Sequence, residues 1–165
     1  MPLKSVKVGG CLEGPLAIVD IELTYINEDT ESPIECSYEF PIDPDTVVSQ
    51  LIAKIGDKEI EAKIKEKERA KEIYDNAMAG GNAAVYAEKK SEKSESMKIS
   101  LGGIPPLQGA QINIQLIITL PVENSSFSFK LPPDFYPSYK KMGAPDPIGF
   151  SFEVDLSIKS SKKIT

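Results

Sequence analysis

The sequence predicts an all-β protein: an antiparallel β-sandwich of about eight to ten strands with one inserted amphipathic helix. Three observations predict this class. Apolar and polar residues alternate with a period of two over most of the chain, as expected for strands with one buried face. Proline and glycine separate many of the alternating runs. A single stretch has helical periodicity, whereas a parallel sheet would need several crossover helices.

The first half of the chain contains two pairs of alternating runs. Residues 19–25 and 34–40 place apolar side chains at every second position, with a polar turn between them, and are expected to pair antiparallel. Residues 51–55 and 60–64 flank a short turn that begins at Gly56. A short loop with Gly and Asp between two such runs predicts a hairpin.

Residues 66–79 are expected to form the helix. The apolar positions in this stretch are Ala70, Ile73, Tyr74, Ala77 and Met78. Their i, i+3, i+4, i+7, i+8 spacing places them on one face of a helix, opposite a charged face. Gly80 and Gly81 then end the helix, because glycine adopts the left-handed conformation of a helix C-terminus at little cost.

The second half of the chain returns to the strand pattern. Its alternating runs are 97–101, 112–120, 127–131 and 148–158. The polar stretch 88–96 and the proline-rich stretch 132–147 are expected to be loops. We expect a single domain over residues 1–158, with 159–165 as a frayed end or the start of a linker.

Length and charge exclude several classes of partner. The chain has 165 residues, which suits one domain, and its net charge is −6. An acidic chain lacks the electrostatic footprint expected for nucleic acid or an anionic membrane. It contains neither an apolar run of the ~20 residues that cross a bilayer nor the pattern of a secretory signal at its start. These features predict a cytoplasmic protein.

The composition also restricts the chemistry. The chain has no histidine and only two cysteines, Cys11 and Cys36, so histidine-dependent triads and zinc sites of His and Cys are excluded within it. A reducing compartment favours free thiols, although a disulfide between the two stays open. We predict no catalytic, cofactor-binding or metal-binding residues, and no enzyme.

Several segments resemble the VIT domain, the module named after vault proteins and inter-alpha-trypsin inhibitor heavy chains. Residues 55–74, which run from the predicted hairpin into the helix, are similar to the central motif of that family. The turn at residues 102–106, Gly-Gly-Ile-Pro-Pro, is similar to its Gly-Asn-Ile-Pro-Pro turn, with Gly103 in place of the asparagine. Ser138 stands where the family usually has arginine. The resemblance implies a β-sandwich of the kind usually found before a von Willebrand factor A domain, and a vault-related protein.

Two functions of different classes remain open. The first is a non-catalytic module for protein–protein interaction or scaffolding, with a von Willebrand factor A domain as partner in cis or in trans. The alternative is a stand-alone sandwich that binds a small ligand or carbohydrate. Sugar-binding sandwiches usually expose a tryptophan or tyrosine side chain as a platform for the sugar, and this sequence has no tryptophan. For the first function, the candidate protein contacts lie on the outer face of the helix and in the proline-rich loop: Lys67, Arg69, Lys71, Phe135, Tyr136 and Tyr139.

Overall fold

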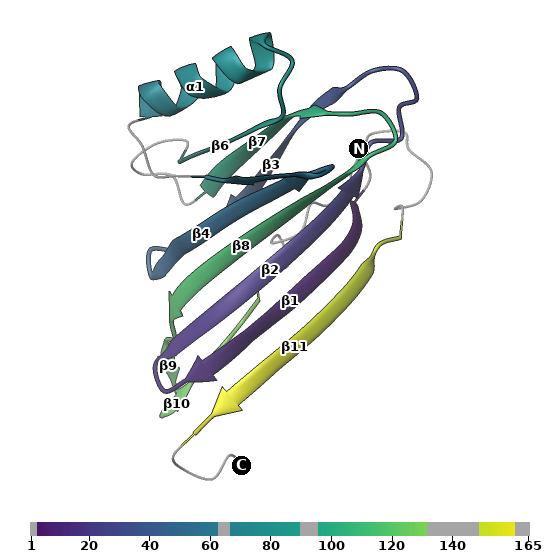
Figure 1. Cartoon of the computed structure of the whole chain (residues 1–165). Coiled ribbons are helices and arrows are strands. Elements are labelled where there is room, and N and C mark those ends of the chain that lie inside the picture. The colour runs from purple at the N-terminus through teal and green to yellow at the C-terminus, as the bar shows by residue number, and fades with distance from the viewer. Residues whose placement is uncertain (1–2, 63–66, 90–95, 132–148, 161–165) are drawn as a thin grey trace, which may run out of the picture.

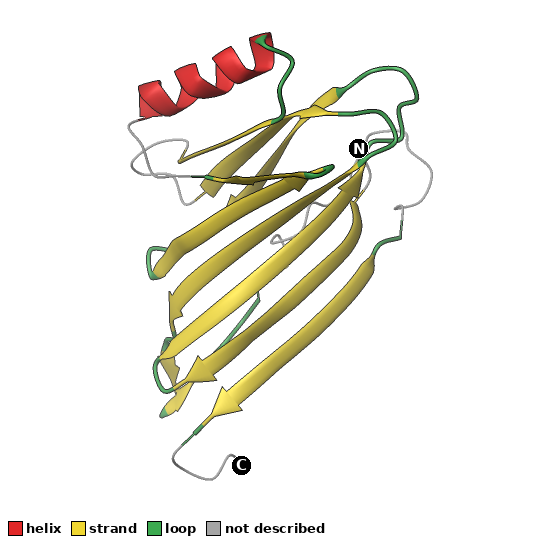
Figure 2. Cartoon of the chain, in the orientation of Figure 1, coloured by secondary structure: helices red, strands yellow, loops and turns green. Residues whose placement is uncertain are grey.

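The computed structural model describes residues 3–62, 67–89, 96–131 and 149–160. One helix and eleven strands are assigned within them. Figures 1 and 2 show how these elements are arranged. In chain order they are β1 (Leu3–Glu13), β2 (Leu16–Ile26), β3 (Ile34–Pro41), β4 (Thr46–Ile55), β5 (Lys58–Glu61), α1 (Lys67–Ala79), β6 (Ala84–Lys89), β7 (Ser96–Ile104), β8 (Gly109–Thr119), β9 (Val122–Glu123), β10 (Ser126–Phe127) and β11 (Ser151–Lys159).

The strands form two main sheets and a small hairpin. The larger sheet has six strands in the order β11-β1-β2-β8-β4-β5, and the smaller has three in the order β3-β7-β6. Strands β9 and β10 pair with each other. Neighbouring strands are antiparallel except β1 and β11, which run parallel, as their arrows show in Figure 1. The larger sheet ends at β11 and β5 and does not close into a barrel.

The core lies between the two sheets. Each long strand sends every second side chain inward, and these side chains are apolar, because alternation matches the pleat of a strand. The largest fully buried side chains are Phe40, Leu3, Ile21, Leu23, Ile99, Leu101, Ile104, Ile112, Ile114, Leu116, Val6 and Val19. They come from both sheets, so the all-β fold with one helix that the sequence predicts is confirmed.

Strand pairing differs from the sequence prediction in one place. Strands β2 and β3 do not pair: β2 lies between β1 and β8 in the larger sheet, and β3 pairs with β7 in the smaller. The polar stretch between them is therefore a connection between two sheets. Alternation predicts which face of a strand is buried, but it carries no information about the partner strand. The predicted hairpin around Gly56 is present as β4 and β5.

Two further boundaries differ from the expectation. Strand β10 ends at Phe127, and Phe129 and Leu131 follow as partly buried residues outside a strand. Strand β7 continues through Gly102 and Gly103 to Ile104, so the expected turn begins only at Pro105. The predicted loops at 88–96 and 132–147 lie largely or wholly outside the described residues.

Strand β11 forms one edge of the larger sheet. Its inward side chains include Val154 and Ile158, which share a face with Val8 and Leu12 of β1. Val154 and Ile158 are nonetheless exposed, whereas Val8 is buried. The apolar inner face of the larger sheet therefore extends to a strand where much of it meets solvent.

Candidate interaction surfaces

Helix α1 lies against the outer face of the smaller sheet, on the side of the molecule away from β11 (Figure 1). Tyr74 of the helix is buried with Ala84 and Tyr86 of β6, and Ala70, Ala77 and Met78 pack around them. The Tyr74 and Tyr86 rings are tilted at 42°, with their centroids 6.0 Å apart. The predicted helical periodicity thus produces a second, smaller apolar layer outside the main core.

A hydrogen bond adds to this apolar layer. The Tyr74 hydroxyl donates to Glu35 Oε1 of β3 at 2.7 Å. Burial, and then the bond to the Glu35 carboxylate, raise the pKa of Tyr74 above its ordinary value, because both favour the protonated phenol. The hydroxyl therefore stays a donor at neutral pH and links α1 to the strand at the far edge of the smaller sheet.

Gly102 of β7 allows the helix to come close to the sheet. A Cβ atom at this position would meet the Met78 sulfur and would lie 2.7 Å from the Tyr74 hydroxyl oxygen. Glycine is used where another element approaches a strand this closely. The first glycine of the Gly-Gly-Ile-Pro-Pro motif is therefore required for packing rather than for a turn.

The residues predicted as protein contacts on the helix fall within α1. Lys71 is exposed, in agreement with the solvent side predicted for it, and the backbone of Lys67 and Arg69 is helical. Ile73, which the periodicity assigns to the buried face, is 46% exposed. The smaller sheet is narrow, so Tyr74 takes the central position and Ile73 lies to one side. The other predicted contacts, Phe135, Tyr136 and Tyr139, lie outside the described residues.

Asn27 connects the two sheets, and the pattern of the sequence does not predict this role. It is 1% exposed, and its Nδ2 donates to the carbonyl oxygens of Ile104 at 3.0 Å, Pro105 at 3.1 Å and Ser32 at 3.2 Å. Its Oδ1 accepts from the Asp29 amide at 2.9 Å. One buried amide therefore satisfies backbone groups of two loops.

The end of β7 and the turn that follows it, which Asn27 holds, each contain a residue with positive φ. Gly103 has φ +68°, and a Cβ there would lie 2.8 Å from the Asn82 carbonyl oxygen. Glycine is suited to both constraints, because it has no Cβ and adopts a positive φ at little cost. Leu107 has φ +57° and is exposed at the tip of the turn, where its amide donates to the Asp29 carbonyl at 3.2 Å.

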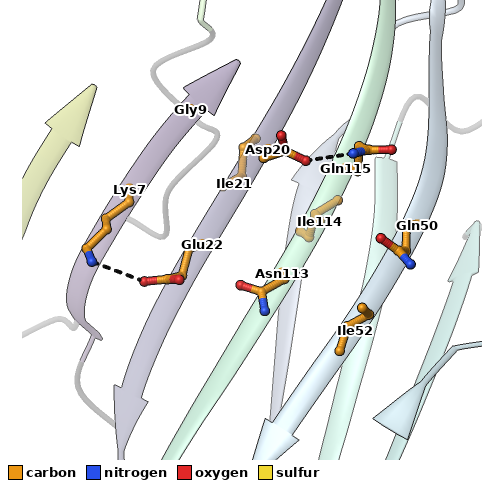
Figure 3. Close-up of a pocket in the computed structure, with 10 residues that line it drawn as sticks. All are labelled: Lys7, Gly9, Asp20, Ile21, Glu22, Gln50, Ile52, Asn113, Ile114 and Gln115. Atoms are coloured by element: carbon orange, nitrogen blue, oxygen red, sulfur yellow. Dashed lines mark hydrogen bonds and ion pairs between the residues drawn. The ribbon is translucent and has the colours of Figure 1, made fainter. Parts of the chain in front are cut away.

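The outer face of the larger sheet carries an open hollow of about 410 Å³ (Figure 3). Polar side chains project from neighbouring strands around it: Lys7 Nζ lies 3.6 Å from Glu22 Oε1, and Gln115 Nε2 donates to Asp20 Oδ1 at 2.8 Å. Asn113 lies beside them. No aromatic side chain is among the described residues that line the hollow, so the platform expected of a sugar site is not formed there.

Both cysteines are free thiols. Burial raises the pKa of the Cys36 thiol on β3 to about 11, so at neutral pH it is protonated and a poor nucleophile. Cys11 is half-buried on β1, in the other sheet. Among the described residues, no group of three or more Cys, Asp or Glu side chains is arranged to hold a metal ion.

Exposed apolar side chains gather on the larger sheet and the hairpin that follows it. They include Leu16, Ile18, Val47, Ile117, Val122, Phe127, Phe152, Val154 and Ile158. Only Ile73 and Leu107 among the large exposed apolar residues of the described chain lie elsewhere. Those on β2, β8 and β4 lie on the outer face of the sheet, whereas those on β11 lie on its inner face, so they form separate patches. Exposed apolar patches of sufficient size mark sites where a protein meets another macromolecule.

The described part of the chain contains no helix with both the length and the apolar character needed to span a bilayer. The architecture of the described residues defines the class of the protein: a β-sandwich of two unequal sheets, with one helix outside the smaller one. The match with known families agrees. Residues 3–117 match the Vault protein inter-alpha-trypsin domain, VIT, and the chain belongs to this family.

The curated relatives place this module in larger proteins. The chain is 29% identical to von Willebrand factor A domain-containing protein 5A of Homo sapiens over 145 residues, which is 87% of the chain and 18% of the relative. It is 30% identical to a von Willebrand factor A domain-containing protein of Dictyostelium discoideum over 142 residues, 86% of the chain and 15% of the relative. It is also 32% identical to protein mono-ADP-ribosyltransferase PARP4 of Mus musculus over 132 residues, 80% of the chain and 7% of the relative. The chain therefore spans less than a fifth of each of these relatives.

Proposed function

We propose that this chain is a non-catalytic contact module whose role is to pack against a von Willebrand factor A domain, in the same polypeptide or in a separate one. The observation that carries the proposal is the exposure of apolar side chains on the outer face of the larger sheet, where Ile18, Ile117 and Val47 lie opposite one another on adjacent strands. An apolar surface of this kind is stabilised when another folded surface covers it.

The relatives support the choice of partner. Two of those described above are named for their von Willebrand factor A domain, and this chain corresponds to a small part of each. In such proteins the VIT module and its neighbour are held in one polypeptide, so even a modest contact surface is occupied most of the time. The proposal extends this arrangement to the present chain.

The same proposal covers the remaining expectations from the sequence. The net charge of −6 supports a protein partner rather than nucleic acid or an anionic membrane. We propose an intracellular, cytoplasmic scaffold role, and we keep Lys71 of α1 as a candidate contact because its side chain is exposed. The other five remain candidates on the basis of the sequence alone: Lys67, Arg69, Phe135, Tyr136 and Tyr139.

The proposal is tested by cross-linking the native protein in extracts of its source cells. An antibody against this module isolates the protein, a lysine- and carboxylate-reactive reagent joins residues in contact, and mass spectrometry identifies the linked peptides. We expect links between this module and a von Willebrand factor A domain of the same or another polypeptide. Recovery of the module with no such domain linked to it would contradict the proposal.

A second function is favoured by one observation, the polar hollow of the larger sheet. Its carboxylate and amide side chains could hydrogen-bond a small hydrophilic ligand. Ligand-observed NMR with a panel of monosaccharides and disaccharides tests this alternative. Saturation transfer that disappears in an Asn113→Ala variant would favour ligand binding over the contact module. Absence of saturation transfer for every sugar in the panel would contradict carbohydrate binding.

A further inference from the structure

We infer that a row of four side chains on the outer face of the larger sheet is the surface on which a domain following β11 in the same polypeptide rests. The row consists of Cys11, Ile18, Ile117 and Val47, and we call it the outer apolar row. The inference rests on the proposed function and names the surface that performs it.

Strand register places the four side chains next to one another. Cys11 of β1 is opposite Ile18 of β2, Ile18 is opposite Ile117 of β8, and Ile117 is opposite Val47 of β4. Directly opposite residues share a face, so the row crosses four adjacent strands without a gap. At ~4.8 Å between strands, it is about 14 Å long.

The outer apolar row is exposed although its position predicts polar residues. Ile18 is 45% exposed, Ile117 36% and Val47 59%. Their neighbours along the strands, Ala17 and Leu116, point inward and are buried in the core, so the row does not contribute to that core.

Most side chains around the hollow on the same face are polar, as expected for a face in contact with solvent. Two residues further along their strands, Asp20 and Gln115 are polar and hydrogen-bonded to each other (Figure 3). The next residues in the same direction include Glu22, which pairs with Lys7. The large exposed apolar side chains of this face are thus those of the row and Leu16 next to it, whereas polar side chains predominate around the hollow, which indicates that a partner covers only the part of the face at the row.

The course of β11 identifies the partner as the polypeptide that follows it. Ser157 of β11 lies opposite Cys11 and extends the line of the row to the sheet edge. Two residues later, Lys159 Nζ lies 3.8 Å from Glu13 Oε2, where β11 ends. Residues that continue from this end therefore start beside the row, and a folded domain attached there reaches it without a long linker.

Charge and area argue against a second copy of this chain as the partner. Asp20, Asp155 and Glu13 border the row, so two copies placed face to face would bring carboxylates together, and each copy carries a net charge of −6. Four partly exposed side chains offer roughly a few hundred Å² at most, below the ~800 Å² per partner of a stable interface between separate proteins. A tethered domain needs less area, because its effective concentration is in the millimolar range. The partner surface is expected to be apolar at its centre and basic at its rim.

Cys11 provides a native probe of the row. The rate at which a maleimide labels Cys11 is measured by peptide mass spectrometry in the native polypeptide and in the isolated chain 1–165, under conditions where circular dichroism shows both to be folded. We expect labelling to be at least about tenfold slower in the native polypeptide, because the docked domain must open before the thiol reacts.

Substitutions in the row locate the cause of this protection. The double variant Ile18→Thr, Ile117→Thr keeps β-branched residues in both strands but weakens the apolar contact, so Cys11 labelling in the native polypeptide should return to within about twofold of the isolated chain. The matched control is Ile158→Thr. The Ile158 side chain is 58% exposed and lies on the face of the sheet opposite the row, so this change should leave the protection of Cys11 unchanged.

The remaining outcomes overturn the inference. Equal labelling of Cys11 in both samples would show that the row is uncovered, and protection that survives the double variant would show that another contact shields the thiol. A native polypeptide with no domain after β11 would also overturn it. Cross-links to a von Willebrand factor A domain in the same samples would show whether the proposed function still stands when the inference about this surface has failed.

Discussion

Single polar side chains hold the loops and the helix of this protein in place. Asn27 is the clearest example, because one buried amide group binds backbone atoms of two loops. Alternation of polar and apolar residues indicates burial at every second position, but it does not predict which polar residue will be buried. That assignment depends on the positions of Ile104 and Pro105, which are 77 and 78 residues away in the chain.

Replacement of Asn27 by alanine is expected to lower the free energy of unfolding by about 2–3 kcal/mol, because several buried backbone groups lose their partner. Urea unfolding followed by circular dichroism measures the change. Asn76→Ala is the control, since Asn76 is exposed on α1 and alanine favours a helix. Equal stability of the Asn27 variant and the wild type would show that water replaces the amide.

Tyr74 makes the stability depend on pH in the alkaline range. Its pKa is raised in the folded state, so the unfolded chain releases the phenolic proton first as pH rises. The contribution of Tyr74 is therefore complete below the ordinary tyrosine pKa of about 10 and is lost progressively above it. We expect the free energy of unfolding to fall between pH 9 and pH 11.

The variant Tyr74→Phe isolates this effect. It lacks the ionisable group, so its loss of stability over the same pH range should be smaller than that of the wild type. At pH 7 the same variant should be less stable by about 1 kcal/mol, the net value of a hydrogen bond of this kind. Parallel pH profiles for the two proteins would assign the alkaline loss to other groups.

At the scale of elements, helix α1 depends on the shape of the sheet beneath it. The helix was predictable, since α1 spans Lys67–Ala79 where periodicity indicates 66–79. Its docking site was not, because the glycine that allows close approach lies on β7, well after α1 in the chain. Tyr74 lies at the centre of the buried side of the helix. Ile73 remains exposed because the smaller sheet beneath the helix is narrow.

Gly102→Ala is expected to weaken the docking of α1 and to lower the free energy of unfolding by about 1–2 kcal/mol, because the new methyl group meets Met78 and Tyr74. Adding Met78→Ala should recover part of the loss by making room for the methyl group. Gly9→Ala serves as the control, since the nearest atom to a Cβ there is the Asp155 carbonyl oxygen at 3.9 Å. Urea unfolding measures all three variants, and a Gly102 variant no less stable than the Gly9 variant would contradict the close approach.

Some strand pairings follow from the local sequence, whereas others depend on residues that are distant in the chain. The β4–β5 hairpin follows from the turn at Gly56, which has φ +57°. Strands β2 and β3 pair instead with strands from the second half of the chain: β2 pairs with β8, and β3 pairs with β7. Local sequence describes the faces of a strand, whereas pairing is decided by how all strands together cover the core.

At the scale of the whole molecule, the sandwich is asymmetric. A six-stranded sheet is packed against a three-stranded one, so apolar side chains at the β11 edge of the larger sheet remain exposed. An edge strand with exposed apolar residues invites association. The isolated chain should therefore self-associate at high concentration more than its net charge of −6 suggests.

Val154→Lys should reduce this association, because it places a charge on the exposed apolar face of β11. Glu153→Gln is the matched control: it makes the same change in net charge on the opposite face of the same strand, further from the outer apolar row. Static light scattering over a concentration series measures the effect. Since both variants reduce the net charge from −6 to −5 and so weaken self-repulsion, a Val154→Lys variant that associates no less than the control would mean that the apolar edge does not govern association.

The fold class, the helix, the buried face of the long strands and membership of the VIT family could all be predicted from the amino-acid sequence, because each depends on local periodicity or on motifs with local spacing. Three features are visible only in the folded chain: Asn27 joins two loops, Gly102 allows the helix to pack closely, and four side chains form one exposed row, namely Cys11, Ile18, Ile117 and Val47. These features consist of residues that are distant in the chain. They become neighbours only through strand register, which is fixed when the complete set of strands closes over a common core.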